Sequence, residues 1–473
     1  MAKSVTAIPQ KRLRGFAMRL GWGLADQAVS SITNFAVTLY VARTLGAEQF
    51  GAFSLTYVTY SFALSASRGL ATDPLMVRFS GAERPAWRRA VSTSSATALM
   101  VGLIAGALVL SGTVFLSGTS RAAFVALGLV LPGLMLQDSW RYAFFALGRG
   151  NFAFINDMIW AIALVPGLVY MHMTGHATVF AFILVWGAAA AVAAAAGPLQ
   201  ARVIPRPSGI PAWLGHHRDL GLRYLAENCA NSGATQLRSY GIGIIVGLAA
   251  VGYVQAAGTL MGPFLVVFMG MSLVTIPEAT RILRRAPHHL RLFCFLAGCG
   301  LAVGALAWGG FLLVALPKGL GAWLLGPIWK PSYGLILPLT VSIMGACFIG
   351  GATGGLHALG AAHRSLRAMI ISAALFLACG LVGAAEGGAL GVMRGAAVAT
   401  WLGALMWWWQ LNAGLRDADI VSPRKRLRRA GSHRLPTEDG RSRQQRRDDP
   451  PDRNLDSTYP HVAQVRPGQG KGA

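Results

Sequence analysis

Charged residues are scarce in this chain: they make up 13% of its residues, whereas 54% are hydrophobic. Carboxylates are the scarcest part of that charge, since 18 Asp and Glu stand against 42 Lys and Arg. The apolar stretches are close to 20 residues long, and about 20 apolar residues span a bilayer as a helix. We therefore predict an all-α polytopic membrane protein.

Cysteines are few, and groupings typical of catalysis are missing. The five cysteines show neither paired nor metal-ligand spacing, so we assign them to helix packing. We find no Ser/His/Asp arrangement, metal cluster or phosphate-binding glycine loop. The sequence therefore argues against an enzyme and indicates no metal or other cofactor. Nucleic-acid binding is disfavoured as well, because no folded basic module is visible.

The apolar stretches predict about twelve transmembrane helices. The expected spans are residues 21–43, 50–74, 90–117, 121–145, 152–173, 177–198, 221–247, 251–277, 292–316, 333–357, 366–384 and 388–413. Basic residues gather in every second connection, whereas the remaining connections hold little more than Arg43, Arg121, Lys318, Lys330 and Arg394. Because positive residues collect on the cytoplasmic side, we expect both termini in the cytoplasm and the spans in the cytoplasmic (inner) membrane.

The two ends of the chain differ from its apolar body. Residues 1–20 form an expected cytoplasmic segment, and no small-residue cleavage site follows the first apolar stretch, so we interpret that stretch as a retained span. Residues 414–473 predict a disordered basic cytoplasmic tail, because they lack the apolar surface needed to fold alone. This tail either binds anionic lipid headgroups or an acidic partner, or is a solvated segment that fixes the topology.

A weak internal repeat organises the spans. A shift of 201 residues aligns Asp26 with Glu227 and Gly51 with Gly252. The expected divisions are an N-terminal six-helix lobe at residues 21–201, a Pro-rich cytoplasmic linker at 202–220 and a C-terminal six-helix lobe at 221–413. Six crossings return the chain to its starting side, so we expect parallel repeats. Transporters with this plan bind substrate between the two halves.

Short motifs in both halves resemble a known family. Residues 41–51 contain an Ala-Arg-x-Leu-Gly turn followed by Phe-Gly and a second helix. With Gly252-Tyr253 through Pro263, and Leu325-Gly326-Pro327-Ile328-Trp329 through Pro338, this pattern is similar to the Wzx-type polysaccharide flippases of the multidrug/oligosaccharidyl-lipid/polysaccharide exporter superfamily. The resemblance covers residues 15–413. It implies a transporter that moves a polyprenyl-(pyro)phosphate-linked oligosaccharide between leaflets for cell-envelope polysaccharide biosynthesis.

Two arginines, Arg68 and Arg238, lie deep within expected spans. Charge at that depth is costly and usually faces partners, water or substrate. Helical spacing places Arg238 on one stripe with Glu227 and Asn231, and Arg68 on a stripe with Tyr60. Because arginine binds phosphate in bidentate fashion and stays ionised, we predict a cationic central cavity for the substrate's phosphate. Alternatively, the stripes join neighbouring helices through hydrogen bonds.

Further charged residues are weaker candidates for the same cavity. Arg43 lies near the outer end of its helix, where it is a substrate contact or a snorkelling side chain. Arg141 follows Asp138 by one turn, so it is a phosphate contact, a cytoplasmic cap or half of an internal ion pair. Asp26, Glu227 and Asp138 are ion-coupling candidates for H⁺ or Na⁺, or counter-charges to the arginines.

Two other function classes stay open. A cation- or proton-coupled multidrug exporter of the same superfamily would hold a cationic substrate with membrane carboxylates, which the buried arginines argue against. A membrane glycosyltransferase or polymerase would need catalytic side chains in a sizeable outer loop, and the expected outer loops are short. The expected partners are the lipid-linked oligosaccharide, membrane lipids and glycan-assembly enzymes.

Overall fold

The computed structural model describes residues 10–175, 177–315 and 318–418, so most of the predicted basic tail lies outside it. The described residues form helices and turns without a strand. The helices of the first half are α1 Gln10–Thr44, α2 Ala47–Ser67, the π-helix η1 Arg68–Thr72, α3 Asp73–Phe79, α4 Arg84–Gly112, α5 Gly118–Ala146, α6 Gly150–Thr174 and α7 Val179–Ala201. Those of the second are α8 Ile210–Ile245, α9 Leu248–Leu260, α10 Gly262–Arg285, α11 Leu290–Gly310, α12 Lys318–Leu325, α13 Trp329–Ala358 and α14 Ala362–Asp417.

The predicted all-α membrane fold is confirmed. The described residues of each expected span lie almost entirely in one helix or in consecutive helical segments, such as α2, η1 and α3 for residues 50–74. Eight helices among the described residues are long and apolar enough to cross a membrane. The helices α1, α2 and α8 are not among those eight. α2 and α8 contact each other through the hydroxyls of Thr59 and Tyr240, and α1 is joined to α5 through Asp26 and Arg141.

The last two expected spans form one helical hairpin within α14. Gly387 and Gly388 have non-helical backbone angles, and Gly388 has a φ of 55°, which a side chain would oppose. A Cβ at Gly391 would lie 1.9 Å from the carbonyl oxygen of Gly383. The two arms are therefore packed backbone to backbone, and the turn between 366–384 and 388–413 is as tight as the sequence predicted.

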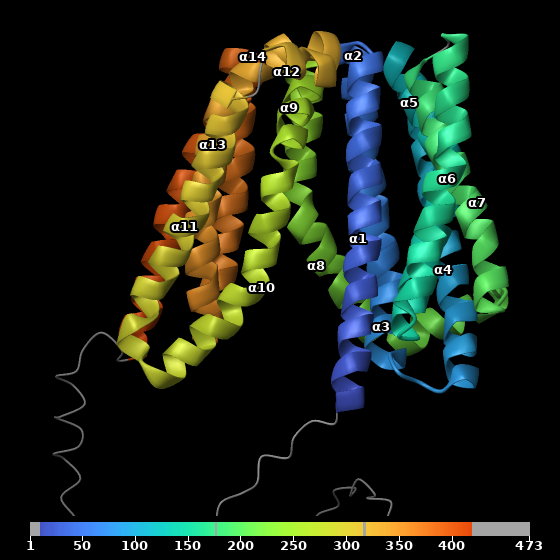
Figure 1. Cartoon of the computed structure of the whole chain (residues 1–473), viewed down its shortest axis with the longest axis horizontal. Coiled ribbons are helices and arrows are strands. Elements are labelled where there is room, and N and C mark those ends of the chain that lie inside the picture. The colour runs from blue at the N-terminus through green and yellow to red at the C-terminus, as the bar shows by residue number, and fades with distance from the viewer. Residues whose placement is uncertain (1–9, 176, 316–317, 419–473) are drawn as a thin grey trace, which may run out of the picture. The chain divides into compact units, whose positions relative to one another are not determined.

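Glycines also join the two halves. A Cβ at Gly51 would lie 1.7 Å from the carbonyl oxygen of Leu248, and one at Gly252 would lie 2.6 Å from that of Ala47. The shift of 201 residues exchanges these two contacts, since it turns Ala47 into Leu248 and Gly51 into Gly252. Residues related by that shift thus form a reciprocal contact between α2 and α9, which lie together at the upper end of Figure 1.

The second spans of the two halves are both interrupted. α2 passes into the π-helix η1 at Arg68 before α3 begins, and α9 ends at Leu260 before α10 begins at Gly262. Such wide or broken turns leave backbone groups to be satisfied by neighbours, which occurs in membranes only where the segment is buried in protein or lines water. Both interruptions are consequently expected on the inner side of their half.

α8 begins earlier than its expected span, because its first turns are amphipathic. Trp213 is 5% exposed, and its indole nitrogen donates to the carbonyl oxygen of Leu70 at 3.1 Å. Arg78 forms an ion pair with Asp219 at 2.8 Å. Residues 210–219, assigned to the linker from sequence, therefore pack as a helix against η1 and α3.

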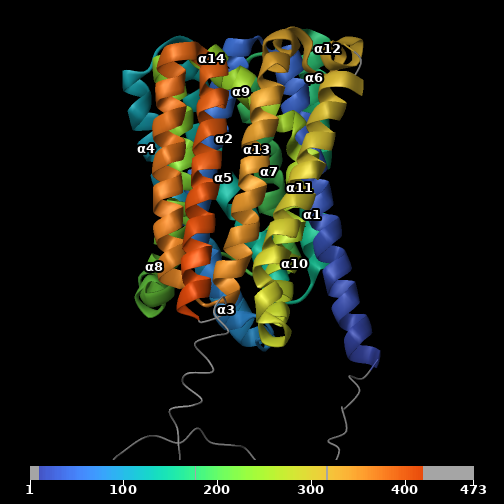
Figure 2. The same cartoon turned by 90° about the vertical axis from the view of Figure 1, so that its left-hand side faces the viewer.

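Both ends of the described chain lie at the same end of the helices. Figure 1 shows the start of α1 and the end of α14 at its lower side, and Figure 2 shows the same arrangement from the side, with α11, α13 and α14 next to one another. An even number of crossings places the termini on one side, in agreement with the predicted count.

Candidate functional site

Arg68 lies at the transition from α2 to η1 and forms a two-pronged ion pair with α5. Its Nε donates to Asp138 Oδ2 at 3.1 Å, and its Nη2 donates to Asp138 Oδ1 at 2.7 Å. The guanidinium carbon lies 5.0 Å from the centre of the Tyr142 ring. The Arg68 side chain is 30% exposed, whereas that of Asp138 is 7% exposed. One face of this cation therefore stays accessible while its charge is compensated.

Arg141, also on α5, binds carboxylates from two other helices. Its Nη2 lies 2.6 Å from Asp26 Oδ2 on α1, and its Nε lies 3.5 Å from Asp157 Oδ2 on α6. The side chains of Asp26 and Asp157 are 0% and 3% exposed. This buried cluster connects α1, α5 and α6, and its low dielectric surroundings strengthen each attraction.

A chain of side-chain amides extends from this cluster. Gln137 donates through Nε2 to Asp157 Oδ1 at 2.9 Å and to Asn156 Oδ1 at 3.2 Å. Asn156 donates in turn to the carbonyl oxygen of Ala193 at 2.9 Å and to Gln200 Oε1 at 2.8 Å. Polar groups at this depth lack water, so such bonds position the carboxylate of Asp157 as well as satisfying the amides.

Carboxylates outnumber guanidinium groups in this part of the first half. Three aspartates, Asp26, Asp138 and Asp157, contact two arginines, Arg68 and Arg141. Asp26 Oδ1 and Asp157 Oδ2 are buried without a hydrogen-bond partner among the described residues. The cluster therefore holds one carboxyl group more than it has guanidinium groups, which suits the binding of a proton or a small cation.

Arg238 on α8 is the contrasting case. It is 9% exposed, and its guanidinium carbon lies 4.1 Å from the centre of the Phe376 ring on α14. A Cβ at Gly380 would lie 2.7 Å from Arg238 Cδ, so the glycine leaves room for this side chain. Arg238 Nε and Nη1 have no hydrogen-bond partner in the described part of the chain. Arg238 is therefore a buried cation held by an aromatic face and no described carboxylate.

Hydrogen bonds join α8 to α2 and to the start of α3 in the first half. Asn228 donates through Nδ2 to the carbonyl oxygen of Ser65 at 3.3 Å and to Asp73 Oδ2 at 3.2 Å. The hydroxyls of Thr59 and Tyr240 form a further bond between α2 and α8. These contacts bring the helix that carries Arg238 alongside the helix that carries Arg68.

Of the three readings that the sequence left open for Arg141, an ion pair with Asp138 is not among the ion pairs of the described residues. Arg141 binds Asp26 and approaches Asp157, whereas Asp138 is bound by Arg68. Asp26 and Asp138 thus each lie beside an arginine, as a counter-charge would; this is one of the two roles that the sequence left open for them. Asp138 is buried as well, but both of its oxygens accept hydrogen bonds from Arg68, which therefore takes the place of Arg141 as its partner.

Arg43 and Tyr60 lie outside the ion-pair cluster. The Arg43 guanidinium lies 5.1 Å from the centre of the Trp323 ring on α12, which favours the interpretation of an interfacial side chain over that of a substrate contact. Tyr60 is 8% exposed and packs edge-on against Trp186 at 5.0 Å between ring centres. The side chains of Glu227 and Asn231 lie outside the described ones, so their predicted roles stay predictions.

Sequence reasoning missed Asp157 and its amide neighbours. Asp157 lies inside the expected span 152–173, so the rule that flagged Arg68 also applied to it. Asn156 and Gln137 carry no charge, and nothing in their local spacing indicated that they meet. Among the described residues, no group of three or more His, Cys, Asp or Glu has the geometry to hold a metal ion.

Comparisons with known proteins give the fold a precedent. No family model matches the chain, and no characterised protein matches its sequence. An inward-facing multidrug resistance transporter of the MATE family, in the MOP superfamily, is similar with a TM-score of 0.64 and 15% identity, over 85% of this chain and 99% of that one. An outward-facing MATE transporter has a TM-score of 0.53 and 15% identity, over 86% and 96% of the two chains.

A second kind of transporter shares the fold. The lipid II flippase MurJ, in an inward closed conformation, is similar with a TM-score of 0.60 and 11% identity, over 83% of this chain and 87% of that one. Multidrug exporters and a lipid flippase are transporters rather than enzymes. The chain therefore shares the fold of these transporters.

Proposed function

We propose that the protein is a flippase that moves a polyprenyl-(pyro)phosphate-linked oligosaccharide across the cytoplasmic membrane, with both termini in the cytoplasm. The observation that carries this proposal is Arg238, which is 9% exposed and lacks a described carboxylate partner. A buried cation without compensation costs several kcal/mol. An anionic substrate group that enters beside it removes that penalty, and a phosphate presents oxygens that match the guanidinium fork.

Arg68 supplies a second contact for the same anion. Its side chain is 30% exposed and lies beside Tyr142, so a phosphate oxygen can approach the guanidinium face that Asp138 leaves open. Aromatic rings near this cation also suit a sugar. The two halves would thus each contribute one arginine. Arg68 is already paired with Asp138, whereas Arg238 would pair with the substrate's anion.

Coupling to an ion resides in the first half. The unsatisfied oxygens of Asp26 and Asp157 suit the binding of H⁺ or Na⁺ between them, with Arg141 as their shared partner. Binding there weakens the hold of Asp26 on Arg141 and so changes how α1 is attached to α5. The membrane potential adds a driving force, since each negative charge carried outward gains about 2.3 kcal/mol per 100 mV.

The higher TM-score with the inward-facing MATE structure, 0.64 against 0.53 for the outward-facing one, supports an inward-facing state for this structure. In that state the cavity is open to the leaflet on which a lipid-linked substrate is assembled. Alternating access then follows from a rearrangement about the reciprocal glycine contact between α2 and α9.

A cation-coupled multidrug exporter is the second candidate function. The observation that favours it is the excess of carboxylate over guanidinium in the cluster of Asp26, Asp138 and Asp157, which suits a cationic drug. The two functions differ in what Arg238 does. It binds the substrate's phosphate in a flippase, whereas it repels a cationic substrate in a drug exporter.

The test is transport by the purified protein in liposomes. The assay follows a fluorescent polyprenyl-pyrophosphate oligosaccharide from one leaflet to the other, and separately a cationic dye, for wild type, Arg238→Gln and the matched control Arg394→Gln, which removes an exposed arginine. We expect lipid transfer that Arg238→Gln reduces by at least tenfold and that Arg394→Gln leaves unchanged. Dye export without lipid transfer would replace this proposal with the exporter.

A further inference from the structure

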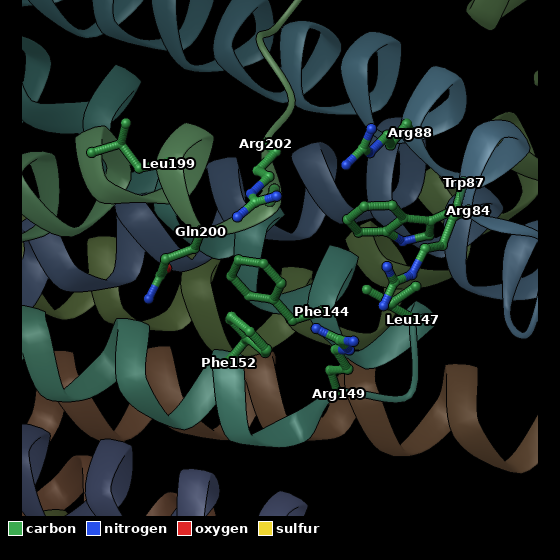
Figure 3. Close-up of a pocket in the computed structure, with 11 residues that line it drawn as sticks. Arg84, Trp87, Arg88, Phe144, Leu147, Arg149, Phe152, Leu199, Gln200 and Arg202 are labelled. Carbon is green, nitrogen blue, oxygen red and sulfur yellow. The ribbon is translucent and has the colours of Figure 1, made fainter.

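A second group of arginines surrounds a cavity at the end of the first half where α4 begins and α7 ends. The cavity has a volume of about 420 Å³. Figure 3 shows Arg84, Arg88, Arg149 and Arg202 around its rim, with the Trp87 and Phe144 rings between them. An adjacent cavity of about 590 Å³ shares Arg88 and Arg202. These arginines come from three different segments, namely the start of α4, the turn before α6 and the end of α7, so the fold collects the positive charge.

The floor of this cavity is apolar and its polar atoms are satisfied. Trp87 is 2% exposed and Phe144 is 1% exposed. The Trp87 indole nitrogen donates to the carbonyl oxygen of Ala143 at 3.0 Å, and the Arg149 guanidinium lies 5.3 Å from the Phe152 ring centre. The rim therefore presents positive charge while the floor offers no competing acceptor.

The rim arginines have no ion-pair partner in the part of the chain that the structure describes. No ion pair between described residues involves Arg84, Arg88, Arg149 or Arg202. Several guanidinium groups around one cavity repel one another and concentrate a positive potential there. An anion that binds between them relieves the repulsion and accepts several charge-assisted hydrogen bonds at once.

Arg202 holds a backbone conformation that usually belongs to glycine. It caps α7 with a φ of 53°, and it is the sole residue other than glycine with a positive φ among the described residues. A left-handed residue with a side chain is strained, and such strain concentrates at ligand sites. An arginine at this position therefore strains the backbone, but it places a guanidinium group at the cavity.

The mouth of the cavity is bordered by exposed apolar side chains. Leu199 lines it and is 81% exposed, and Ile204 lines the adjacent cavity and is 75% exposed. Apolar exposure next to arginines, at the ends of spanning helices, is typical of the membrane interface. Basic pockets at that level bind phospholipid headgroups. A water-soluble phosphate compound has no acyl chains that could contact the apolar border.

We propose that this cavity binds the phosphate headgroup of an anionic phospholipid from the leaflet at this end of the helices. The headgroup phosphate contacts Arg84, Arg88 and Arg202, and the acyl chains pass along Leu199 and Ile204. This site is separate from the ion-pair cluster, and the inference depends on the membrane fold and not on which substrate is carried.

The experiment is native mass spectrometry of the full chain in detergent, titrated with phosphatidylglycerol and, separately, with phosphatidylcholine. The variants are Arg202→Gly and the double variant Arg84→Gln with Arg88→Gln. A matched double variant, Arg121→Gln with Arg394→Gln, removes two exposed arginines elsewhere. We expect weaker phosphatidylglycerol binding by about fivefold for Arg202→Gly and about 25-fold for the double variant, from a contribution of about fivefold for each basic residue.

Arg202→Gly separates binding from folding. Glycine suits the left-handed backbone, so the thermal stability of lipid-free protein should stay the same or rise while lipid binding falls. Unchanged phosphatidylglycerol binding in the site variants, or an equal loss in the matched double variant, would overturn the proposal. Displacement of the lipid by inorganic pyrophosphate at equal concentration would assign the site to a soluble phosphate compound and also overturn it. Because the readout is lipid binding, failure here leaves the transport test unaffected.

Discussion

The two halves of the molecule treat an intramembrane arginine in opposite ways. In the first half, Arg141 and Arg68 each bind a buried aspartate from another helix. In the second half, Arg238 is also buried, and among the described residues its guanidinium lies against the Phe376 ring and forms no ion pair. A buried arginine therefore joins two helices in the first half, whereas in the second half it is a cation without a described counter-charge.

This difference in pairing indicates which arginine is available to bind a substrate. A buried charge that already has its partner contributes to the attachment of helices, and removing it leaves the partner uncompensated. A buried charge without a partner lowers stability and is retained only where something else compensates it. The comparison predicts opposite stability changes for equivalent substitutions in the two halves.

The largest effect should follow from Arg141→Met. This change leaves Asp26 and Asp157 buried without their cation, so the free energy of unfolding should fall by about 3–5 kcal/mol. It is measured by denaturant unfolding of the purified protein in mild detergent. Arg78→Met is the control, because the ion pair of Arg78 with Asp219 is exposed and should lose no more than about 1 kcal/mol. Equal losses for both variants would remove the distinction between buried and exposed pairs.

Arg238→Met should have the opposite sign. An apolar side chain of similar length removes the uncompensated charge, so the free energy of unfolding without substrate should rise by about 1–4 kcal/mol. The same denaturant unfolding measures it, and transport of the lipid-linked substrate should be lost. Arg238→Lys is the control, since it keeps the charge and should not stabilise. A destabilised Arg238→Met variant would show that this arginine has a structural partner after all.

Arg68 and Asp138 should show an intermediate coupling. A double-mutant cycle with Arg68→Gln and Asp138→Asn should give an interaction free energy of about 0.5–3 kcal/mol. It should be smaller than the loss from Arg141→Met, because the Arg68 side chain is 30% exposed and that of Arg141 is 15% exposed. A coupling of zero would mean that Arg68 is held by the Tyr142 ring alone.

The smallest effect should be a pH dependence at the start of α8, outside the predicted span. Burial against Trp213 and Phe79, and then the positive charges of Arg78 and His216, lower the pKa of His217 below its usual value of 6.5. Its neutral form accepts a hydrogen bond from Arg78 at 2.7 Å. The unfolded chain therefore binds the proton more readily, so stability falls as the pH drops below about 6.5.

Thermal unfolding of wild type and His217→Phe between pH 8 and pH 5 checks this dependence. The wild type should lose more stability than the variant over that interval, because only the wild type has the imidazole to protonate. Parallel curves for the two proteins would indicate that His217 titrates alike in the folded and unfolded chain.

Much of the fold was predictable because its signals are local. Span length, the alternation of basic loops and the glycine repeat are all properties of short segments, and each is set by the bilayer or by backbone packing. The expected bounds 366–384 and 388–413 left only a short connection between the last two spans, as α14 has it. The early start of α8 was missed because Trp213 and Leu214 pack against a distant segment, and no local pattern identifies that neighbour.

By itself the sequence determined that this chain is a multi-pass membrane protein, and that Arg68, Arg141 and Arg238 lie within its expected spans. The tertiary structure alone decided which of them is compensated, since Asp26 lies 115 residues from Arg141 along the chain and Asp157 approaches from a third helix. Hydropathy depends on each residue's own transfer between water and lipid. Ion pairing depends on distance in the folded molecule, which only the packing of the helices establishes.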